Sequence, residues 1–330
     1  MSQLAPTLEA FFSERLLSQK NASPHTVASY RDCWRLLLGY VHQTTGTAPS
    51  GLSLDDLDAT VIGAFLDHLE RDRGVSVSSR NTRLAAVHSL FRFAALRHPE
   101  HAALIQRVLA IPAKRAERAI VCFLTPPEAD ALLASPDRSR WTGRRDHALL
   151  LVAVQTGLRV SELTGLRLRD IHLGTGAHVR CTGKGRKDRA TPLTRQTVAV
   201  MRTYLTERDG GAPGDPVFPG PRGGRLSRDA VRRLVERHTA TAALNCPSLA
   251  SKKASPHVLR HTAAMRLLES GCDLATIALW LGHENPRTSQ IYLHAHLALK
   301  ERALARTTPP DTRPGRYQPS DPVLAFLDQL

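Results

Sequence analysis

Cysteine is scarce in this sequence, and its spacing matches neither a disulfide framework nor a zinc site. The five cysteines, at positions 33, 122, 181, 246 and 272, are scattered along the chain, and no two form a CxxC pair. An odd, scattered set of this kind argues against both kinds of site and fits a reducing compartment.

Long apolar runs and nucleotide-binding loops are also absent. No stretch of about 18 apolar residues occurs, which a membrane-spanning helix would need. Residues 1–17 show no basic segment ahead of an apolar one, which a secretory signal would have. Neither G-x-x-x-x-G-K-[ST] nor G-x-G-x-x-G is present, so nothing indicates ATP or NAD binding. We expect a cytoplasmic protein that uses no cofactor.

The composition is that of a folded protein with a strongly basic C-terminal part. The chain has 330 residues, enough for roughly two domains. Residues 1–110 contain 11 Lys/Arg and 10 Asp/Glu, whereas residues 111–330 contain 34 and 20. An excess of this size favours a polyanionic partner, because each neutralised phosphate releases counterions. A soluble basic protein, or a host with an arginine-rich proteome, would show the same excess.

Apolar periodicity predicts helices throughout the first third of the chain. Helix-spaced apolar residues indicate helices over 7–19, 24–41, 58–73 and 78–97. The dipeptide Ser23-Pro24 is typical of a helix start. The arginines between residues 71 and 97 form a basic patch, which is either a solvated helix face or a phosphate-tracking one.

The pattern changes beyond residue 110. Residues 112–118 break the apolar periodicity and predict a basic linker. A capped helix start follows at Thr125, and an apolar helix ends at Gly157. Residues 178–182 and 189–193 predict two short strands around a turn, and the chain is helical again from Ser227. The tail after residue 307 is proline-rich and ends in a short amphipathic helix.

Several cationic side chains and one phenol are candidates for chemistry. His257 and His261 have the spacing of a helical metal pair, but Val258 stands where an HExxH motif has glutamate, so we favour a non-metal role. Taken singly, each candidate has a structural explanation, such as a surface cation or a half-buried tyrosine. The candidate residues are Arg159, Lys184, His257, Arg260, His283 and Tyr292.

Together these six residues fit phosphoryl transfer at a DNA diester. That reaction needs cationic donors around the non-bridging oxygens, an in-line nucleophile and a proton donor for the leaving 5′-oxygen. Two arginines, two histidines, a lysine and a tyrosine supply these groups without a metal. A phenol has an ordinary pKa near 10, so an attacking tyrosine needs cationic neighbours or a general base.

The order of the motifs resembles the tyrosine recombinase (phage integrase, Xer-like) family. The resemblance is strong over residues 125–300 and extends more weakly to the N-terminal part, which is similar to the SAM-like, core-binding domain of that family. The motifs that carry it are Thr-Gly-Leu-Arg159-Val-Ser-Glu-Leu, Gly-Lys184-Gly-Arg-Lys, His257-Val-Leu-Arg260-His-Thr, Leu-Gly-His283 and Tyr292.

The resemblance implies a role for each candidate. Arg159 and Arg260 would clamp the scissile phosphate, with His283 as a further donor to it. His257 would assist the nucleophile, and Lys184 on the hairpin would protonate the leaving 5′-oxygen. Tyr292 would attack and form a 3′-phosphotyrosyl bond, so that rejoining needs neither ATP nor a metal. Glu162 would be a structural partner within the site.

The resemblance also implies the architecture and the partners. It predicts a mainly α fold with a small antiparallel sheet: an all-helical SAM-like domain over 1–110, a linker over 111–120 and an α+β catalytic domain over 121–306. The two domains would clamp duplex DNA at specific recombination sites, and four protomers would exchange strands through a Holliday junction in the bacterial cytoplasm, on nucleoid or plasmid DNA. The tail over 307–330 either docks on a neighbouring protomer or is disordered.

Two other functions share these features. A non-catalytic DNA-binding or architectural protein of the same fold would explain the charge, but it would not need Tyr292 or Lys184. A type IB topoisomerase shares the chemistry, but the Xer-like N-terminal part argues against it. The target DNA, the biological role among phage, plasmid, transposon and chromosome-dimer resolution, and the need for accessory proteins or a second recombinase stay open at this stage.

Overall fold

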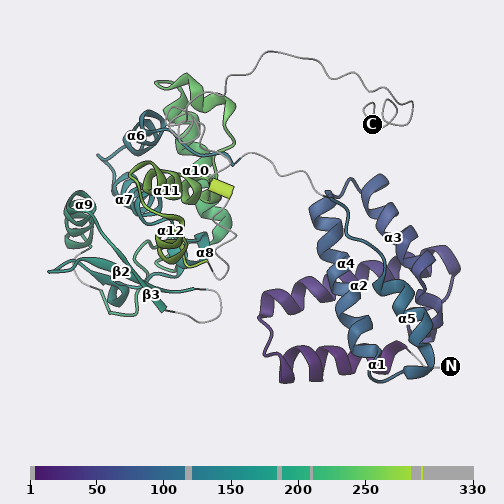
Figure 1. Ribbon diagram of the computed structural model, residues 1–330. Helices are drawn as coiled ribbons and strands as arrows, with labels where there is room; N and C mark the ends of the chain where they lie inside the picture. The colour runs from purple at the N-terminus through teal and green to yellow at the C-terminus, as the bar shows by residue number, and fades with distance from the viewer. Residues whose placement is uncertain (1–3, 116–120, 184–187, 209–210, 284–290, 293–330) are drawn as a thin grey trace, which may run out of the picture. The chain divides into compact units, whose positions relative to one another are not determined.

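The computed structural model describes residues 4–115, 121–183, 188–208, 211–283 and 291–292. The chain divides into two compact units, residues 1–118 and 119–330 (Figure 1). None of the helices over the described residues is both long and apolar enough to pass through a bilayer.

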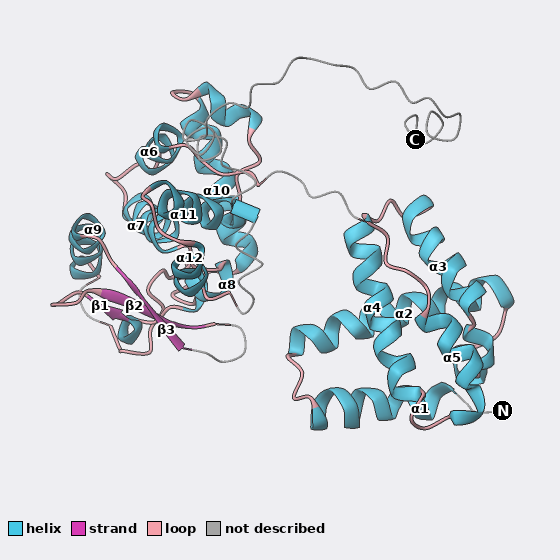
Figure 2. Ribbon diagram, viewed as in Figure 1, coloured by secondary structure: helices cyan, strands magenta, loops and turns pink. Residues whose placement is uncertain are grey.

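The elements of the first unit are helices (Figure 2). The side chain of Ser23 accepts a hydrogen bond from the backbone N–H of Thr26, and Pro24 occupies the first turn, which explains why a helix begins there. The helix expected over 7–19 is instead an α-helix continued by a π-helix. The elements are α1 (Leu4–Ala10), the π-helix η1 (Phe11–Gln19), α2 (Pro24–Thr45), α3 (Ala59–Arg71), α4 (Val77–Ala94) and α5 (Ala102–Leu109), with short 3-10 turns η2 (Pro49–Gly51), η3 (Asp55–Leu57) and η4 (Pro99–His101).

Aromatic and branched side chains form the core of the first unit. Trp34, Phe65 and Phe91 are each at most 1% exposed, and they lie on three different helices. Burying a side chain of this size contributes about 1.5–3 kcal/mol. The unit therefore has a hydrophobic core of its own.

The second unit combines helices with one small sheet. It contains both the predicted hairpin and the predicted helix that ends at Gly157. The elements are α6 (Pro126–Ala134), α7 (Trp141–Thr156), α8 (Val160–Gly165), β1 (Ile171–His172), β2 (His178–Thr182), β3 (Asp188–Pro192), α9 (Arg195–Thr206), α10 (Arg228–Ala243), α11 (Pro256–Glu269) and α12 (Leu274–Leu281), with 3-10 turns η5 (Leu168–Asp170) and η7 (Pro247–Ser251).

The sheet is antiparallel, with the strand order β1-β2-β3. In the central pair Val179 faces Thr191 and Cys181 faces Arg189, so the inward residues of β3 are Thr191 and Arg189. The predicted fold class, mainly α with a small antiparallel sheet, is confirmed. The turn with Lys184 and the tail over 307–330 lie outside the described residues.

A central helix pair positions the site. Helix α7 is buried along most of its length and packs against α11, which also contacts α10 and α12 (Figure 1). Ser255 caps the start of α11 with a hydrogen bond from the backbone N–H of Val258. The rigid packing of α7, α11 and α12 brings their ends to one place.

Candidate active site

Two helix ends meet at the centre of the site. Helix α7 ends at Gly157 (φ 63°) and α12 ends at Gly282 (φ 64°), both in the left-handed conformation that favours glycine. A Cβ on Gly157 would lie 2.7 Å from Cδ2 of Leu281 and 3.0 Å from Cβ of Ala263. The glycines of the TGLR and LGH motifs thus end two helices and let them approach closely.

Arg260 is held by the carbonyls of these helix ends. Its Nη1 donates to the carbonyl oxygen of Gly157 at 2.7 Å, and its Nη2 donates to that of Leu281 at 2.7 Å. Helix C-termini carry partial negative charge, which stabilises a cation placed there. The side chain is buried, and burial together with the nearby charge of Arg159 lowers its pKa to about 10. The group remains charged at neutral pH.

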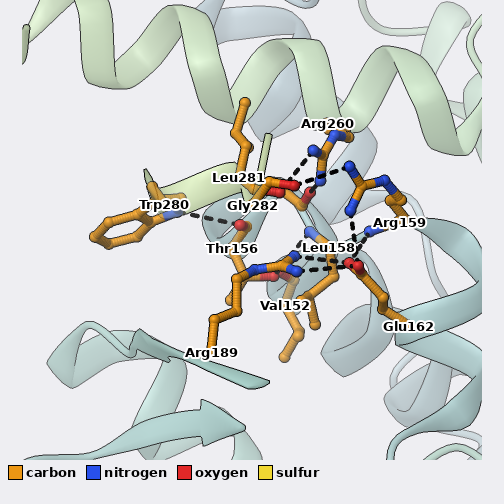
Figure 3. A network of polar contacts seen from close by, with 11 residues as sticks. Val152, Thr156, Leu158, Arg159, Glu162, Arg189, Arg260, Trp280, Leu281 and Gly282 are labelled. Atoms are coloured by element: carbon orange, nitrogen blue, oxygen red, sulfur yellow. Dashed lines mark hydrogen bonds and ion pairs between the residues drawn. The ribbon is translucent and has the colours of Figure 1, made fainter. Parts of the chain in front are cut away.

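Arg159 immediately precedes α8, and its side chain contacts the end of α12. Its Nη2 donates to the carbonyl oxygen of Gly282 at 3.1 Å, and its Nη1 donates to Oε1 of Glu162 at 2.9 Å (Figure 3). The side chain is 32% exposed. An anionic ligand can therefore reach this guanidinium from solvent.

Glu162 accepts hydrogen bonds from two arginines. Arg189 on β3 donates from Nη1 to Oε1 at 3.0 Å and from Nη2 to Oε2 at 2.7 Å, and the backbone N–H of Arg159 donates to Oε2 at 2.8 Å. Burial alone would raise the pKa of Glu162, but the bonds from Arg189 and then from Arg159 outweigh burial and lower it. Glu162 thus makes the contacts within the site that the sequence predicts for it.

The phenol of Tyr292 lies against a histidine. Its hydroxyl is 3.2 Å from Nδ1 of His261, and the ring of His261 contacts that of His257 with centroids 4.3 Å apart. Tyr292 is 1% exposed, and burial raises its pKa although the charges of Arg260 and Arg159 oppose that rise. The ring of Tyr292 also stacks on that of His283, with centroids 6.4 Å apart.

The site histidines are driven towards their neutral forms. Burial and then the charge of Arg260 lower the pKa of His257 and take that of His283 to about 4. Burial and then His257 lower the pKa of His261 to about 4. These imidazoles are therefore uncharged at neutral pH and can accept a proton.

Five of the six predicted site residues come together. Arg159 and Arg260 donate to carbonyl oxygens at the end of α12, next to His283. The ring of His283 stacks on that of Tyr292, with centroids 6.4 Å apart, and Tyr292 contacts His261, whose ring packs against His257. Lys184 lies outside the described residues.

Sequence reasoning missed the contributions of Arg189 and His261. The alternation of β3 places Arg189 on the inward face with Thr191, which is a signal that an arginine there has a buried partner. The i,i+4 spacing of His257 and His261 shows that they share a helix face, but it does not reveal the bond to Tyr292.

The arrangement can bind a tetrahedral anion and move a proton next to it. Two fixed guanidinium groups suit bidentate contacts to phosphate oxygens, and a neutral imidazole touches a phenol. Among the described residues, no group of three or more His, Cys, Asp or Glu side chains could hold a metal ion.

Comparison with known proteins identifies the family. The phage integrase family matches residues 122–298, and its N-terminal SAM-like domain matches residues 9–98. The y4rC protein of Sinorhizobium fredii, assigned as an integrase or recombinase, is 55% identical over 100% of this chain and 99% of its own. The tyrosine recombinase XerC of Pelobacter propionicus is 36% identical over 87% of this chain and 90% of its own.

A solved structure agrees with these relatives. The XerH site-specific recombinase bound to palindromic difH substrate, in a post-cleavage complex, superposes with a TM-score of 0.70 at 25% identity, over 87% of this chain and 81% of that one. The chain therefore belongs to the phage integrase family and is a tyrosine recombinase, an enzyme of site-specific DNA recombination that cleaves and rejoins DNA.

Proposed function

We propose that this enzyme recombines double-stranded DNA at specific sites, with Tyr292 as the nucleophile. The phenolic oxygen attacks the scissile phosphorus, a 3′-phosphotyrosyl bond forms, and the bond to the 5′-oxygen breaks. The 5′-hydroxyl of another strand then reverses the step. Because the diester energy is kept in the protein–DNA bond, rejoining needs neither ATP nor a metal.

Arg159 and Arg260 bind the non-bridging oxygens in this proposal. Both guanidinium groups are already held by carbonyl oxygens of Gly157, Leu281 and Gly282, so little reorganisation accompanies binding. Each guanidinium has five N–H donors, which leaves several for a phosphate. His283 is a further donor, and its neutral ring can offer one N–H.

The phenol proton passes to an imidazole. His261 is within 3.2 Å of the Tyr292 hydroxyl, and its lowered pKa keeps the ring neutral, which leaves a nitrogen lone pair for the phenol but also weakens the ring as a base. The phosphate that Arg159 and Arg260 would bind brings negative charge to the site, which raises the basicity of the ring. His257 contacts the His261 ring and is the second candidate for this step. Because Tyr292 is 1% exposed, its hydroxyl must be uncovered before it reaches a phosphodiester. Lys184 is proposed to protonate the leaving 5′-oxygen.

The surface next to the site carries both arginines and carboxylates. A cavity of about 410 Å³ borders Glu162, and its lining includes Arg167, Arg169 and Arg180 together with Asp170 and Asp188. The arginines among them are groups that contact phosphates bidentately.

The proposal includes the assembly and the domain roles. Residues 1–110 would bind DNA, 111–120 would link the domains and 121–306 would carry catalysis, with four protomers acting on two sites. A neighbouring protomer is the proposed partner of the tail over 307–330, which lies outside the described residues.

One observation carries the proposal: the phenol of Tyr292 lies against the imidazole of His261, and its ring stacks on His283, which follows the helix end that Arg159 and Arg260 bind. The test is covalent trapping. The protein is incubated with a library of nicked duplexes of random sequence, denatured in SDS, and the attached DNA is sequenced. We expect the wild type to retain a specific set of duplexes and Tyr292→Phe to retain none, while Tyr292→Phe still binds the recovered duplex with wild-type affinity.

Two outcomes would contradict the proposal. Covalent attachment by Tyr292→Phe would show that another residue is the nucleophile. Attachment without sequence preference, together with relaxation of a supercoiled plasmid that lacks the recovered site, would instead indicate a topoisomerase.

A further inference from the structure

Arg189 is not among the residues proposed to touch DNA. Two hydrogen bonds connect it to Glu162, which in turn holds Arg159. Arg189 comes from β3, and its guanidinium fork meets the carboxylate of Glu162 on both oxygens, at 3.0 and 2.7 Å. Its side chain is 12% exposed and that of Glu162 is 4% exposed. Two parallel hydrogen bonds between buried groups fix the plane and the position of the carboxylate.

The same carboxylate holds Arg159. Oxygen Oε1 accepts from Nη1 of Arg159 at 2.9 Å and Oε2 accepts from its backbone N–H at 2.8 Å. Each oxygen of Glu162 thus receives one bond from Arg189 and one from Arg159. Removing the fork of Arg189 would leave the buried carboxylate with two of its four donors and free to turn, and Arg159 would turn with it.

The absence of a side chain at Gly282 leaves room for Arg189. A Cβ on Gly282 would lie 2.8 Å from Nη1 of Arg189 and 3.1 Å from its Cζ, so the side chain lies directly over this glycine. The carbonyl of Gly282 is also the acceptor for Nη2 of Arg159 (Figure 3). Arg189 therefore contacts both supports of the Arg159 guanidinium, the carboxylate of Glu162 and the helix end at Gly282.

We infer that Arg189 is a positioning residue for DNA cleavage: it sets the guanidinium of Arg159 through Glu162, and so ties the base of the β2–β3 hairpin to the phosphate clamp. The inference rests on the proposed role of Arg159. Misplacing a catalytic group by about 1 Å can lower a rate by about 100-fold, and loss of an orienting partner lowers activity by about 10- to 100-fold.

The test is Arg189→Lys, which keeps the charge and removes the fork. The Nε atom of Arg189 has no hydrogen-bond partner among the described residues, so the substitution removes no other hydrogen bond. The matched control is Arg232→Lys, because Arg232 is an exposed arginine that bonds Asp229 and Glu236. Two readouts are used: the single-turnover rate of covalent attachment to the trapped duplex, and hydrogen exchange of the backbone N–H of Arg159.

We expect Arg189→Lys to slow attachment by about 10- to 100-fold with unchanged DNA affinity, and to speed exchange at Arg159. Arg232→Lys should match the wild type in both. In a double-mutant cycle, adding Arg189→Lys to Arg159→Lys should cost little more, since both act through one guanidinium. A wild-type attachment rate in Arg189→Lys would overturn the inference, as would full additivity in the cycle.

The exchange readout separates this inference from the proposed function. If the wild type attaches no DNA, the proposed function fails, and unchanged exchange at Arg159 in Arg189→Lys then refutes the positioning role as well. If Arg189→Lys melts early, Glu162→Gln serves instead. It keeps the shape of the side chain, but its amide nitrogen cannot accept a hydrogen bond, so it loses two of the four bonds that the carboxylate receives. It should slow attachment without changing DNA affinity. A wild-type rate in that variant would overturn the inference.

Discussion

At the scale of single residues, the site combines permanent cations with imidazoles that stay neutral. Carbonyl and carboxylate oxygens hold the guanidinium groups of Arg260 and Arg159. Burial, followed by the charge of Arg260 for His283 and of His257 for His261, lowers the pKa of both histidines to about 4. A neutral imidazole is a proton acceptor, and a guanidinium is an anion receptor, so one small region offers both functions.

The lowered pKa values predict acid sensitivity. A histidine with an ordinary pKa near 6.5 binds a proton in the unfolded chain at pH 5–6, whereas His261 and His283 in the folded chain do not. The free energy of unfolding therefore falls as pH decreases from about 6.5 towards 4, by at most roughly 1.4 kcal/mol per pH unit for each histidine.

The measurement is urea unfolding between pH 5 and 7. His261→Asn should flatten the dependence of unfolding free energy on pH, and His283→Asn should do the same. Substitution of the exposed His25 by Asn should follow the wild type. An unchanged slope in both site variants would show that these two histidines titrate alike in the folded and unfolded chains.

Residue identity was enough to name the candidate site residues, but not to predict the contacts among them. Arg159, His257, Arg260 and His283 each stand in a short local motif, so the sequence names them. Arg189 stands 27 positions from Glu162, and His261 stands 31 positions from Tyr292. Such pairs depend on how β3 and the helices pack, which no local pattern records.

At the scale of elements, the site depends on how two helices end. Gly157 and Gly282 both have positive φ, and their carbonyls are acceptors for Arg260 and Arg159. A glycine at a helix end is ordinary. Here the helix ends also supply the acceptors that hold Arg260 and Arg159, so their geometry bears directly on the proposed phosphate clamp.

Gly157→Ala is expected to destabilise more than an alanine at an open helix end. Gly46 ends α2 with φ 75° and would have nothing within 4 Å of an added Cβ, so Gly46→Ala costs only the left-handed strain of about 1–2 kcal/mol. Gly157→Ala adds contacts of 2.7 and 3.0 Å, and overpacking costs about 1–3 kcal/mol more.

The two variants are compared by urea unfolding. The transition of the first unit reports Gly46→Ala, and the transition of the second unit reports Gly157→Ala. DNA attachment should be lost in Gly157→Ala and kept in Gly46→Ala. Equal destabilisation by both alanines would mean that the close approach of Leu281 to Gly157 relaxes without cost.

Elements with strong end signals were predictable, and elements set by packing were not. The capped starts at Ser23 and Thr125 are visible in sequence, and helices begin there. The two-residue strand β1 has no pattern of its own, and it exists because it pairs with β2. The helices α5 and α9 were not predicted, and neither was the π-helix, whose apolar stripe is that of an ordinary helix.

At the scale of the whole molecule, each unit has hydrophobic cores of its own. Among the described residues, one buried cluster lies within residues 1–118 and two lie within 119–330. The first unit holds 14 Lys/Arg and 11 Asp/Glu, and the second holds 31 and 19. The break in apolar periodicity at 112–118 and the shift in charge both indicated a division here. The excess charge accompanies the unit that carries the candidate active site.

Separate cores predict two independent folding units. A fragment of residues 1–118 is long enough to bury its own core, and Trp34, the one tryptophan within it, is 1% exposed in that core. In the full chain with Trp141→Phe and Trp280→Phe, the fluorescence of Trp34 reports the first unit alone. We expect the fragment and this variant to show the same cooperative urea transition, within the error of the midpoint. A fragment that is unfolded in buffer, or one whose midpoint lies well below that of the full chain, would show that the second unit stabilises the first. DNA cleavage would then depend on the stability of both units, because a substitution that destabilises one core would also destabilise the other.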